Sequence, residues 1–175
     1  MKVKNKQGRG KRELSPVTTD HDTNHQNLLW GYSGFLVRRL WQIHVAMFME
    51  ETKESRITPV QFSILLIVRN KPGLDQGSVA RELGLDRSNA ADILARLERR
   101  KLIKRTRSEA DRRAVAISLS AAGARLVSQL EGRILRSHIR LVEDLPVSQR
   151  ELFKTMLQRI VAAKNELGRA PLKLG

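Results

Sequence analysis

The stretch Leu85–Gly123, LDRSNAADILARLERRKLIKRTRSEADRRAVAISLSAAG, decides the fold of this chain because a helical pattern and two strand patterns follow one another within it. A basic helix leads into a strand, an arginine-rich turn and a second strand, an order that predicts a winged helix-turn-helix. Between Arg99 and Arg113, eight side chains are Lys or Arg and two are Asp or Glu. Such a local density of cations attracts a phosphate backbone.

The helix of this stretch is predicted to begin near Asp86 and to bury one apolar stripe, formed by Ala90, Ile93, Leu94 and Leu97. Its polar residues then lie on exposed faces. Asn pairs with adenine and Arg with guanine in the major groove, so the first turn supplies candidates for reading base edges. These candidates are Arg87, Ser88 and Asn89, with Arg96 as a further DNA contact on the same helix.

The predicted wing consists of Ile103–Arg107 and Ala114–Leu119, in which apolar and polar residues alternate. Ser108–Asp111 supplies the turn between the two strands. We expect Arg107 and Arg112 to contact phosphates, which fix the register of a protein on DNA without reading its sequence.

The composition of the whole chain agrees with a polyanionic partner. In 175 residues, 33 Lys and Arg stand against 18 Asp and Glu, a formal charge of +15. The chain has no Cys, which excludes disulfides, thiolate metal sites and thiol-based sensing. We find no signal peptide and no apolar run of the roughly 20 residues that span a bilayer. The sequence therefore predicts a soluble, cytoplasmic protein without membrane contact.

The sequence as a whole divides into five predicted regions. We expect a disordered basic arm at 1–26, a winged helix-turn-helix lobe at 57–119 and a tail at 169–175, with helical dimerisation segments at 27–56 and 120–168. Within the lobe, helices are predicted to run from Thr58-Pro59 to Asn70 and from Asp75 to Leu83. The long helices have more apolar surface than one small core covers, so we infer an obligate homodimer.

The order of these elements resembles that of the MarR (multiple antibiotic resistance regulator) family of bacterial transcription factors, over Gly31 to about Leu167. The resemblance rests on five motifs in sequence: Ile57-Thr58-Pro59-Val60-Gln61-Phe62, Leu83-Gly84-Leu85-Asp86-Arg87-Ser88, Leu97-Glu98-Arg99-Arg100, Ser108-Glu109-Ala110-Asp111-Arg112-Arg113 and Ile117-Ser118-Leu119-Ser120-Ala121-Ala122-Gly123. It implies a mainly α fold with a small β-wing and a two-fold dimer held by the first, fifth and sixth helices. The recognition helices then enter successive major grooves and the wings adjacent minor grooves.

The resemblance also implies roles for individual residues. Asp111 would hold the wing turn, and Arg113 would enter the minor groove. A cleft between the dimerisation helices and the lobe would take an effector, and its aromatic and basic candidates favour an aromatic carboxylate or an acyl-CoA. These candidates are Trp30, Tyr32, Arg39, Trp41, His44, Phe48 and Phe62, with His138 as an optional addition. The alternative for each of them is simple packing in the dimer core.

Two positions depart from the family pattern. Relatives usually end the recognition helix with Gly, whereas this chain has Lys101, which predicts strain or a different helix end. Asp92 stands where some relatives have an Arg directed at DNA. We expect Asp92 to pair with Arg96 or with an arginine of the wing, since a carboxylate facing phosphate is repelled.

The sequence therefore predicts a ligand-responsive transcriptional regulator, most simply a repressor, that binds a pseudopalindromic operator as a homodimer. It shows no catalytic constellation, no cofactor motif and no metal-ligand set, since two of the four His lie in the N-terminal arm. The main alternative is a nonspecific architectural DNA-binding protein. A winged protein-interaction module and a small enzyme are weaker alternatives, because the wing is strongly basic and no catalytic residues are recognisable.

Overall fold

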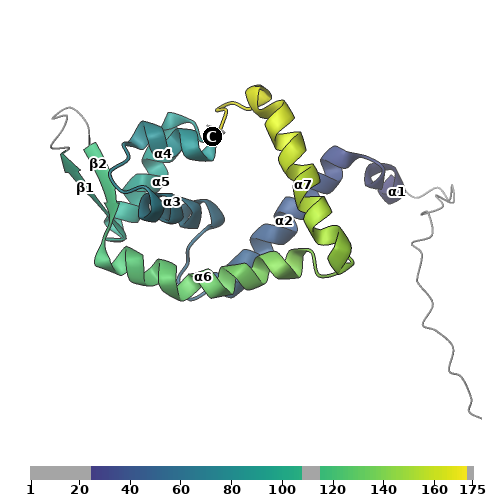
Figure 1. Ribbon diagram of the computed structural model, residues 1–175, viewed down its shortest axis with the longest axis horizontal. Helices are drawn as coiled ribbons and strands as arrows, with labels where there is room; N and C mark the ends of the chain where they lie inside the picture. Colours follow the sequence, from purple (N-terminus) through teal and green to yellow (C-terminus); the bar gives the residue numbers. More distant parts are fainter. Residues whose placement is uncertain (1–24, 108–114, 173–175) are drawn as a thin grey trace, which may run out of the picture. The chain divides into compact units, whose positions relative to one another are not determined.

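The computed structural model describes residues 25–107 and 115–172, and shows a mainly helical chain with one small sheet (Figure 1). A short helix, α1 (His25–Trp30), and a long helix, α2 (Ser33–Thr52), come first. The lobe that follows contains α3 (Pro59–Asn70), α4 (Gln76–Leu83), α5 (Arg87–Arg99), β1 (Ile103–Arg107) and β2 (Val115–Leu119). Two long helices, α6 (Ala121–Leu141) and α7 (Val147–Lys164), and a 3-10 turn (Asn165–Leu167) complete the chain.

The first helical region, predicted as one helical segment at 27–56, forms two helices. The break lies at Gly31, since glycine has a low helix propensity. The Tyr32 amide donates a hydrogen bond to the Leu29 carbonyl oxygen at 3.0 Å in the turn between the two helices. The described chain divides into two compact units at this end, one up to Leu36 and one from Val37 onwards.

Side chains cap the helices of the lobe at the positions that the sequence predicts. Thr58 and Gln61 form a capping box at α3, with Pro59 in its first turn. Asp75 caps α4, Asp86 caps α5 and Ser120 caps α6, each by accepting a backbone N–H three residues later. These four caps fix where each helix begins, and Asp86 thereby sets the position of the recognition helix.

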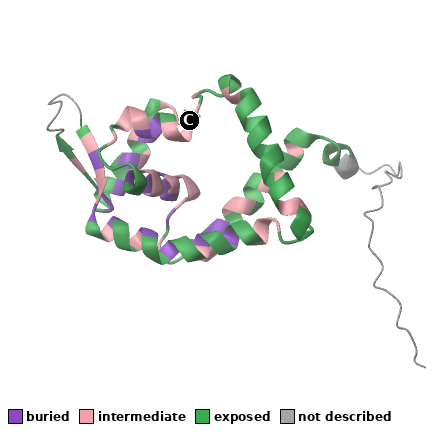
Figure 2. Cartoon of the chain, in the orientation of Figure 1, coloured by how far each residue is buried: buried purple, intermediate pink, exposed green. Residues whose placement is uncertain are grey.

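The core of the protein lies where α3, α5 and the sheet meet, and it continues along one face of α6. Side chains such as Ile64, Leu65, Leu94 and Ile117 are fully buried there. Figure 2 shows the contrast with α7, in which no residue is buried. The predicted stripe of α5 is confirmed, since Ala90, Leu94 and Leu97 are buried and Ile93 packs against the core.

The two strands form an antiparallel hairpin in which Ile103 lies opposite Leu119 and Arg107 opposite Val115. The middle of β2 is attached to the connection between α3 and α4. There the Ile117 amide donates to Leu74 O, and the Gly73 amide donates to Ile117 O, each at 2.9 Å. Helices α4 and α5 with this hairpin form a winged helix-turn-helix, as predicted.

A row of ion pairs joins the end of α2 to α6. Arg133 pairs with Glu54 at 3.3 Å, Arg136 pairs with Glu51 at 3.3 Å, and Arg140 lies 3.1 Å from Glu50. The arginines that interrupt the apolar pattern of α6 therefore have carboxylate partners. Among the described residues, no helix is both long enough and apolar enough to cross a membrane.

Candidate nucleic-acid interface

The turn between α4 and α5 places the first residues of the recognition helix at the surface. Gly84 ends α4 in the left-handed conformation, with φ of 62°, which a glycine adopts without strain. Asp86 then starts α5, and Arg87, Ser88 and Asn89 are all exposed in its first turn. The structure thus brings the three predicted base-reading residues together on one accessible end of one helix.

Two of these three side chains are hydrogen-bonded to the capping carboxylate. Ser88 Oγ donates to Asp86 Oδ1 at 2.7 Å, and Asn89 Nδ2 donates to Asp86 Oδ2 at 2.6 Å. Together with the bond from the Asn89 amide, these contacts lower the pKa of Asp86, so its carboxylate is charged at neutral pH. Asn89 reads an adenine with both its groups only after it releases Asp86, whereas Arg87 has no side-chain partner among the described residues.

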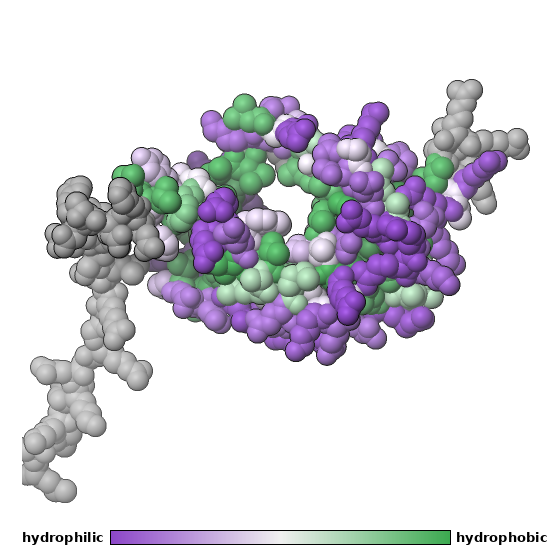
Figure 3. Space-filling model, turned by 180° about the vertical axis from the view of Figure 1, so that it is seen from behind, coloured by the Kyte–Doolittle hydropathy of each residue, from purple (hydrophilic) through white to green (hydrophobic). Residues whose placement is uncertain are grey.

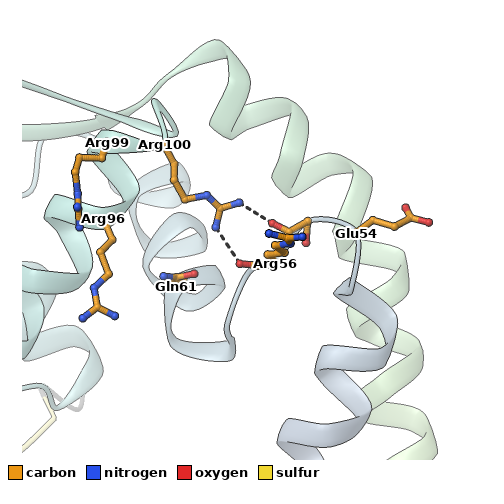
Figure 4. A pocket seen from close by; sticks show the side chains of 7 residues that line it. Glu54, Arg56, Gln61, Arg96, Arg99 and Arg100 are labelled. Atoms are coloured by element: carbon orange, nitrogen blue, oxygen red, sulfur yellow. Dashed lines mark hydrogen bonds between the residues drawn. The ribbon is translucent and has the colours of Figure 1, made fainter.

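The second half of α5 borders a basic hollow of about 650 Å³ (Figure 4). Arg100 is fixed there, because its guanidinium donates to Ser55 O at 2.6 Å and to Arg56 O at 3.0 Å. Arg96 and Arg99 also line the hollow, and neither has an ion pair or side-chain hydrogen bond within the described residues. The full lining is Glu54, Ser55, Arg56, Gln61, Arg96, Arg99 and Arg100.

The only carboxylate that lines this hollow does not neutralise the arginines. Figure 4 shows that Glu54 extends away from Arg96 and Arg99, and its carboxylate pairs with Arg133 of α6. Guanidinium groups that lie close together without carboxylates repel one another, and an anion between them relieves this repulsion. The hollow is therefore suited to phosphate oxygens.

The described part of the wing also presents a cation. Arg107, at the end of β1, is exposed and has no partner among the described residues, whereas Arg105 lies 3.1 Å from Glu98. The predicted wing contacts Arg112 and Arg113 and the turn residue Asp111 lie outside the described residues. The wing beyond Arg107 thus stays a prediction.

Of the two pairings expected for Asp92, the one with Arg96 is not formed, whereas the wing arginines Arg112 and Arg113 lie outside the described residues. Arg96, four residues later, instead lines the hollow, so its guanidinium is used elsewhere on the helix. The expectation for Lys101 is confirmed. Its φ is 58°, so a residue with a Cβ holds the left-handed position that relatives give to glycine.

The predicted effector residues fall into two groups. Trp41, His44, Phe48 and Phe62 form a continuous set of ring contacts, with centroids 5.5, 6.3 and 6.2 Å apart in that order. His44 also stacks on His138 of α6, with ring centroids 5.2 Å apart. Burial lowers the pKa of His44, and the nearby His138 lowers it further, so His44 is neutral at pH 7. Its Nδ1 atom is buried and has no hydrogen-bond partner among the residues that the structure describes.

The remaining effector candidates are Arg39, Trp30 and Tyr32. Arg39 is exposed, and its guanidinium donates a hydrogen bond to the Gln42 side-chain oxygen on the same helix at 3.3 Å. Trp30 and Tyr32 belong to the other compact unit, where the Trp30 ring lies 6.4 Å from that of Phe35.

Sequence reasoning missed two features. Arg56 and Arg99 were not among the predicted DNA contacts, because only the folded chain brings their distant positions to one hollow. The chain after α7, where a tail was expected from residue 169, contains two hydrogen bonds between Asn165 and Leu172, and no pattern in the sequence marks them. The predicted addition of His138 to the effector candidates agrees with its stacking on His44.

Comparison with known proteins gives consistent results. The model of the MarR family matches residues 57–115. The repressor CouR, solved on a 23-mer DNA duplex, is 30% identical, with a TM-score of 0.74 over 80% of this chain and 99% of that one. BpsR of Bordetella bronchiseptica, whose DNA binding is regulated by 6-hydroxynicotinic acid, is 26% identical, with a TM-score of 0.70 over 74% of this chain and 93% of that one.

A curated relative agrees over a shorter region. The transcriptional repressor NicR of Pseudomonas putida is 28% identical over 97 residues, which are 55% of this chain and 61% of that protein. This match spans less than two thirds of the relative's length.

Proposed function

The chain belongs to the MarR family of transcriptional regulators, which are non-enzymatic DNA-binding proteins, and we propose that it is a repressor that binds a pseudopalindromic operator as a homodimer. The observation that carries this proposal is the recognition helix α5. One of its ends exposes Arg87, Ser88 and Asn89, and the other borders a hollow lined by arginines. This arrangement combines base-reading groups with phosphate-binding groups on a single helix.

We assign different roles to the two ends of α5. The first turn reads bases, and Arg87 is the side chain that is free to do so without breaking a hydrogen bond. Arg96 and Arg107, together with Arg99, contact phosphates and fix the register. Arg113 of the wing reaches the minor groove, as Asp-x-Arg does in the family that the sequence resembles. The strong match to CouR, which was solved on a DNA duplex, supports this assignment.

The apolar surface of the long helices supports the presence of a second copy of the chain. On α7, Leu152, Met156 and Ile160 recur every four residues and are all more than half exposed. Figure 3 shows hydrophilic side chains over most of the lobe, with hydrophobic ones at the surface on the α2 and α7 side of the view. A two-fold dimer covers such a surface and presents two recognition helices, which read half-sites about one helical turn apart.

The aromatic cluster around His44 supports an effector site for a small aromatic acid or its CoA thioester. The buried Nδ1 of His44 lacks a partner, and an unsatisfied buried polar atom costs about 1–3 kcal/mol. A ligand with a hydroxylated aromatic ring could stack on Trp41 and form a hydrogen bond with His44 Nδ1, and this bond would remove the energetic penalty of the unsatisfied atom. The regulation of BpsR by 6-hydroxynicotinic acid is a precedent for this ligand class in a relative.

Release from DNA then follows from the difference in affinity between two states of the dimer. The effector weakens operator binding only if it binds better to the state whose recognition helices no longer match the operator. His44 lies on α2 and stacks on α6, and these helices are also joined by the three Arg–Glu pairs. A ligand that separates the two rings therefore changes how α2 lies on α6.

The experiment that tests this proposal is the selection of operators from random duplexes, followed by mobility-shift titration at physiological salt. We expect at least about a thousandfold preference for a selected palindromic site over random DNA. Arg113→Ala should weaken binding to all duplexes, whereas Asn89→Ala should relax the preference among them. A steep salt dependence with no sequence preference would instead establish the architectural alternative.

The effector proposal has its own test. A thermal-shift screen of phenolic acids, hydroxylated pyridine carboxylic acids and aromatic acyl-CoAs is expected to find stabilising compounds that also dissociate the operator complex. His44→Asn should remove the stabilisation by these compounds and leave operator binding intact, and Gln42→Asn on the exposed side of α2 is the matched control. Lack of any response in all three classes would refute the effector and leave the DNA-binding proposal standing.

A further inference from the structure

The chain turns back after α7 and is held in a closed loop by one side chain. Asn165 Nδ2 donates to Leu172 O at 3.0 Å, and the Leu172 amide donates to Asn165 Oδ1 at 2.8 Å. A single amide thus satisfies both backbone groups of a residue seven positions later. This geometry defines a C-terminal loop, Asn165–Leu172, that is fixed at both ends.

The C-terminal loop lies on the turn of the helix-turn-helix. A Cβ atom on Gly84 would stand 2.9 Å from Ala170 O and 3.2 Å from Leu172 Cδ2. The Leu172 side chain and the Ala170 carbonyl therefore cover the α-carbon of Gly84, and both loop residues are partly buried. Figure 1 shows the C-terminal end of the described chain beside α4. Gly84 thus has two reasons to be glycine, its left-handed φ and this close approach.

The contact places a cation beside the start of the recognition helix. Arg169 directly precedes Ala170, and its charge is one of the causes that lower the pKa of Asp86, after the hydrogen bonds from Asn89 and Ser88. The Asp86 carboxylate already accepts from three donors of its own first turn, and it forms no ion pair with Arg169. Arg169 is exposed and has no partner among the described residues.

We propose that the C-terminal loop is part of the DNA-binding surface, and that Arg169 contacts the phosphate backbone next to the bases read by α5. The Asn165 clamp and the contact with Gly84 are the parts of the structure that hold this cation in place. The inference rests on the proposed DNA binding and adds to it a segment that lies about 80 residues from the recognition helix in sequence.

The test is the salt dependence of duplex binding, measured by fluorescence anisotropy on a selected operator and on a random duplex. Each lost phosphate contact lowers the slope of log K against log salt by about 0.9, so Arg169→Gln in a dimer should lower it by about 1.8 on both duplexes. Arg159→Gln is the matched control, since Arg159 is exposed on α7 and has no described partner. This control removes the same charge and should leave the slope unchanged.

The Asn165 clamp is tested without any change of charge. Asn165→Ala should reduce the slope and the affinity in the same direction as Arg169→Gln, and the double variant should be no weaker than Arg169→Gln alone. Circular dichroism and sedimentation verify that each variant is folded and has the oligomeric state of the parent.

Two outcomes overturn the inference. One is an unchanged slope for Arg169→Gln, and the other is an equal decrease for Arg159→Gln, which would reduce the effect to net charge. Failure of the proposed function is distinguishable from both, because it shows as equal binding of the unaltered protein to operator and random duplex.

Discussion

The winged helix-turn-helix lobe and the helix α7 differ in how far their apolar side chains are buried. In the lobe, Leu65, Leu94 and Leu97 have no exposed surface, and their partners come from the same chain. In α7 no residue is buried, although Leu152, Met156 and Ile160 form an apolar row. An exposed apolar row is unfavourable in water. A single chain therefore buries the apolar side chains of the lobe but leaves those of α7 to be covered by another molecule.

This difference separates stability that one chain supplies from stability that depends on protein concentration. Substitutions in the lobe should change the free energy of unfolding of each chain. Substitutions on α7 should change the association of two chains and leave the lobe intact. The following predictions use this distinction, from the largest expected effect to the smallest.

Leu94→Ala removes a fully buried side chain from α5 and should destabilise the protein by about 2–5 kcal/mol. The cause is the lost apolar burial together with the cavity that remains. Urea unfolding followed by circular dichroism measures the change. Leu152→Ala on α7 should cost the lobe less than about 0.5 kcal/mol. A similar loss for both variants would contradict the separation between the two regions.

Ile160→Asp places a charge in the middle of the apolar row of α7. Burying it in a dimer without a partner costs roughly 1–3 kcal/mol, so the dissociation constant of the dimer should increase about 5- to 150-fold. Sedimentation velocity over a concentration series measures this shift. Gln158→Asp adds the same charge to a polar position of the same helix and serves as the control. An unchanged dissociation constant for Ile160→Asp would show that α7 is not part of the interface.

Lys101→Gly should stabilise the lobe by up to about 1 kcal/mol, because Lys101 has a φ of 58° and glycine adopts this conformation without strain. The hydrogen bond from Ser120 Oγ to the Lys101 carbonyl at 2.6 Å is kept in this variant. Thermal and urea unfolding give the change. Lys101→Ala, which retains a Cβ, should show no such gain, and an equal gain in both variants would attribute it to the lost charge.

Arg136→Gln should have the smallest effect, below about 0.5 kcal/mol. The pair of Arg136 with Glu51 is solvent-exposed on the arginine side, and exposed ion pairs contribute little. Glu51 also keeps a second cation, since Arg140 lies 3.4 Å away. Unfolding at low and high salt measures this contribution. A loss above 1 kcal/mol would show that the row of pairs between α2 and α6 acts as a cooperative network.

Much of the lobe was predictable because local chemistry decides it. Thr58, Asp75, Asp86 and Ser120 each precede a helix that they cap, and the spacing of Ala90, Leu94 and Leu97 defines the buried face of α5. The break at Gly31 was missed, since the apolar periodicity continues across it. The pair of Asp92 with Arg96 is not formed, because sequence spacing gives proximity along a helix and does not give side-chain direction.

The sequence by itself determined the winged helix-turn-helix, the excess of positive charge and the residues that the recognition helix exposes. These depend on periodicity, capping and composition, which act over a few residues. Only the tertiary structure placed Arg56 with Arg96, stacked His138 on His44 and laid Ala170 over Gly84. Each of these arrangements brings together positions that are far apart in the chain, and their distance in space is set by how whole helices pack.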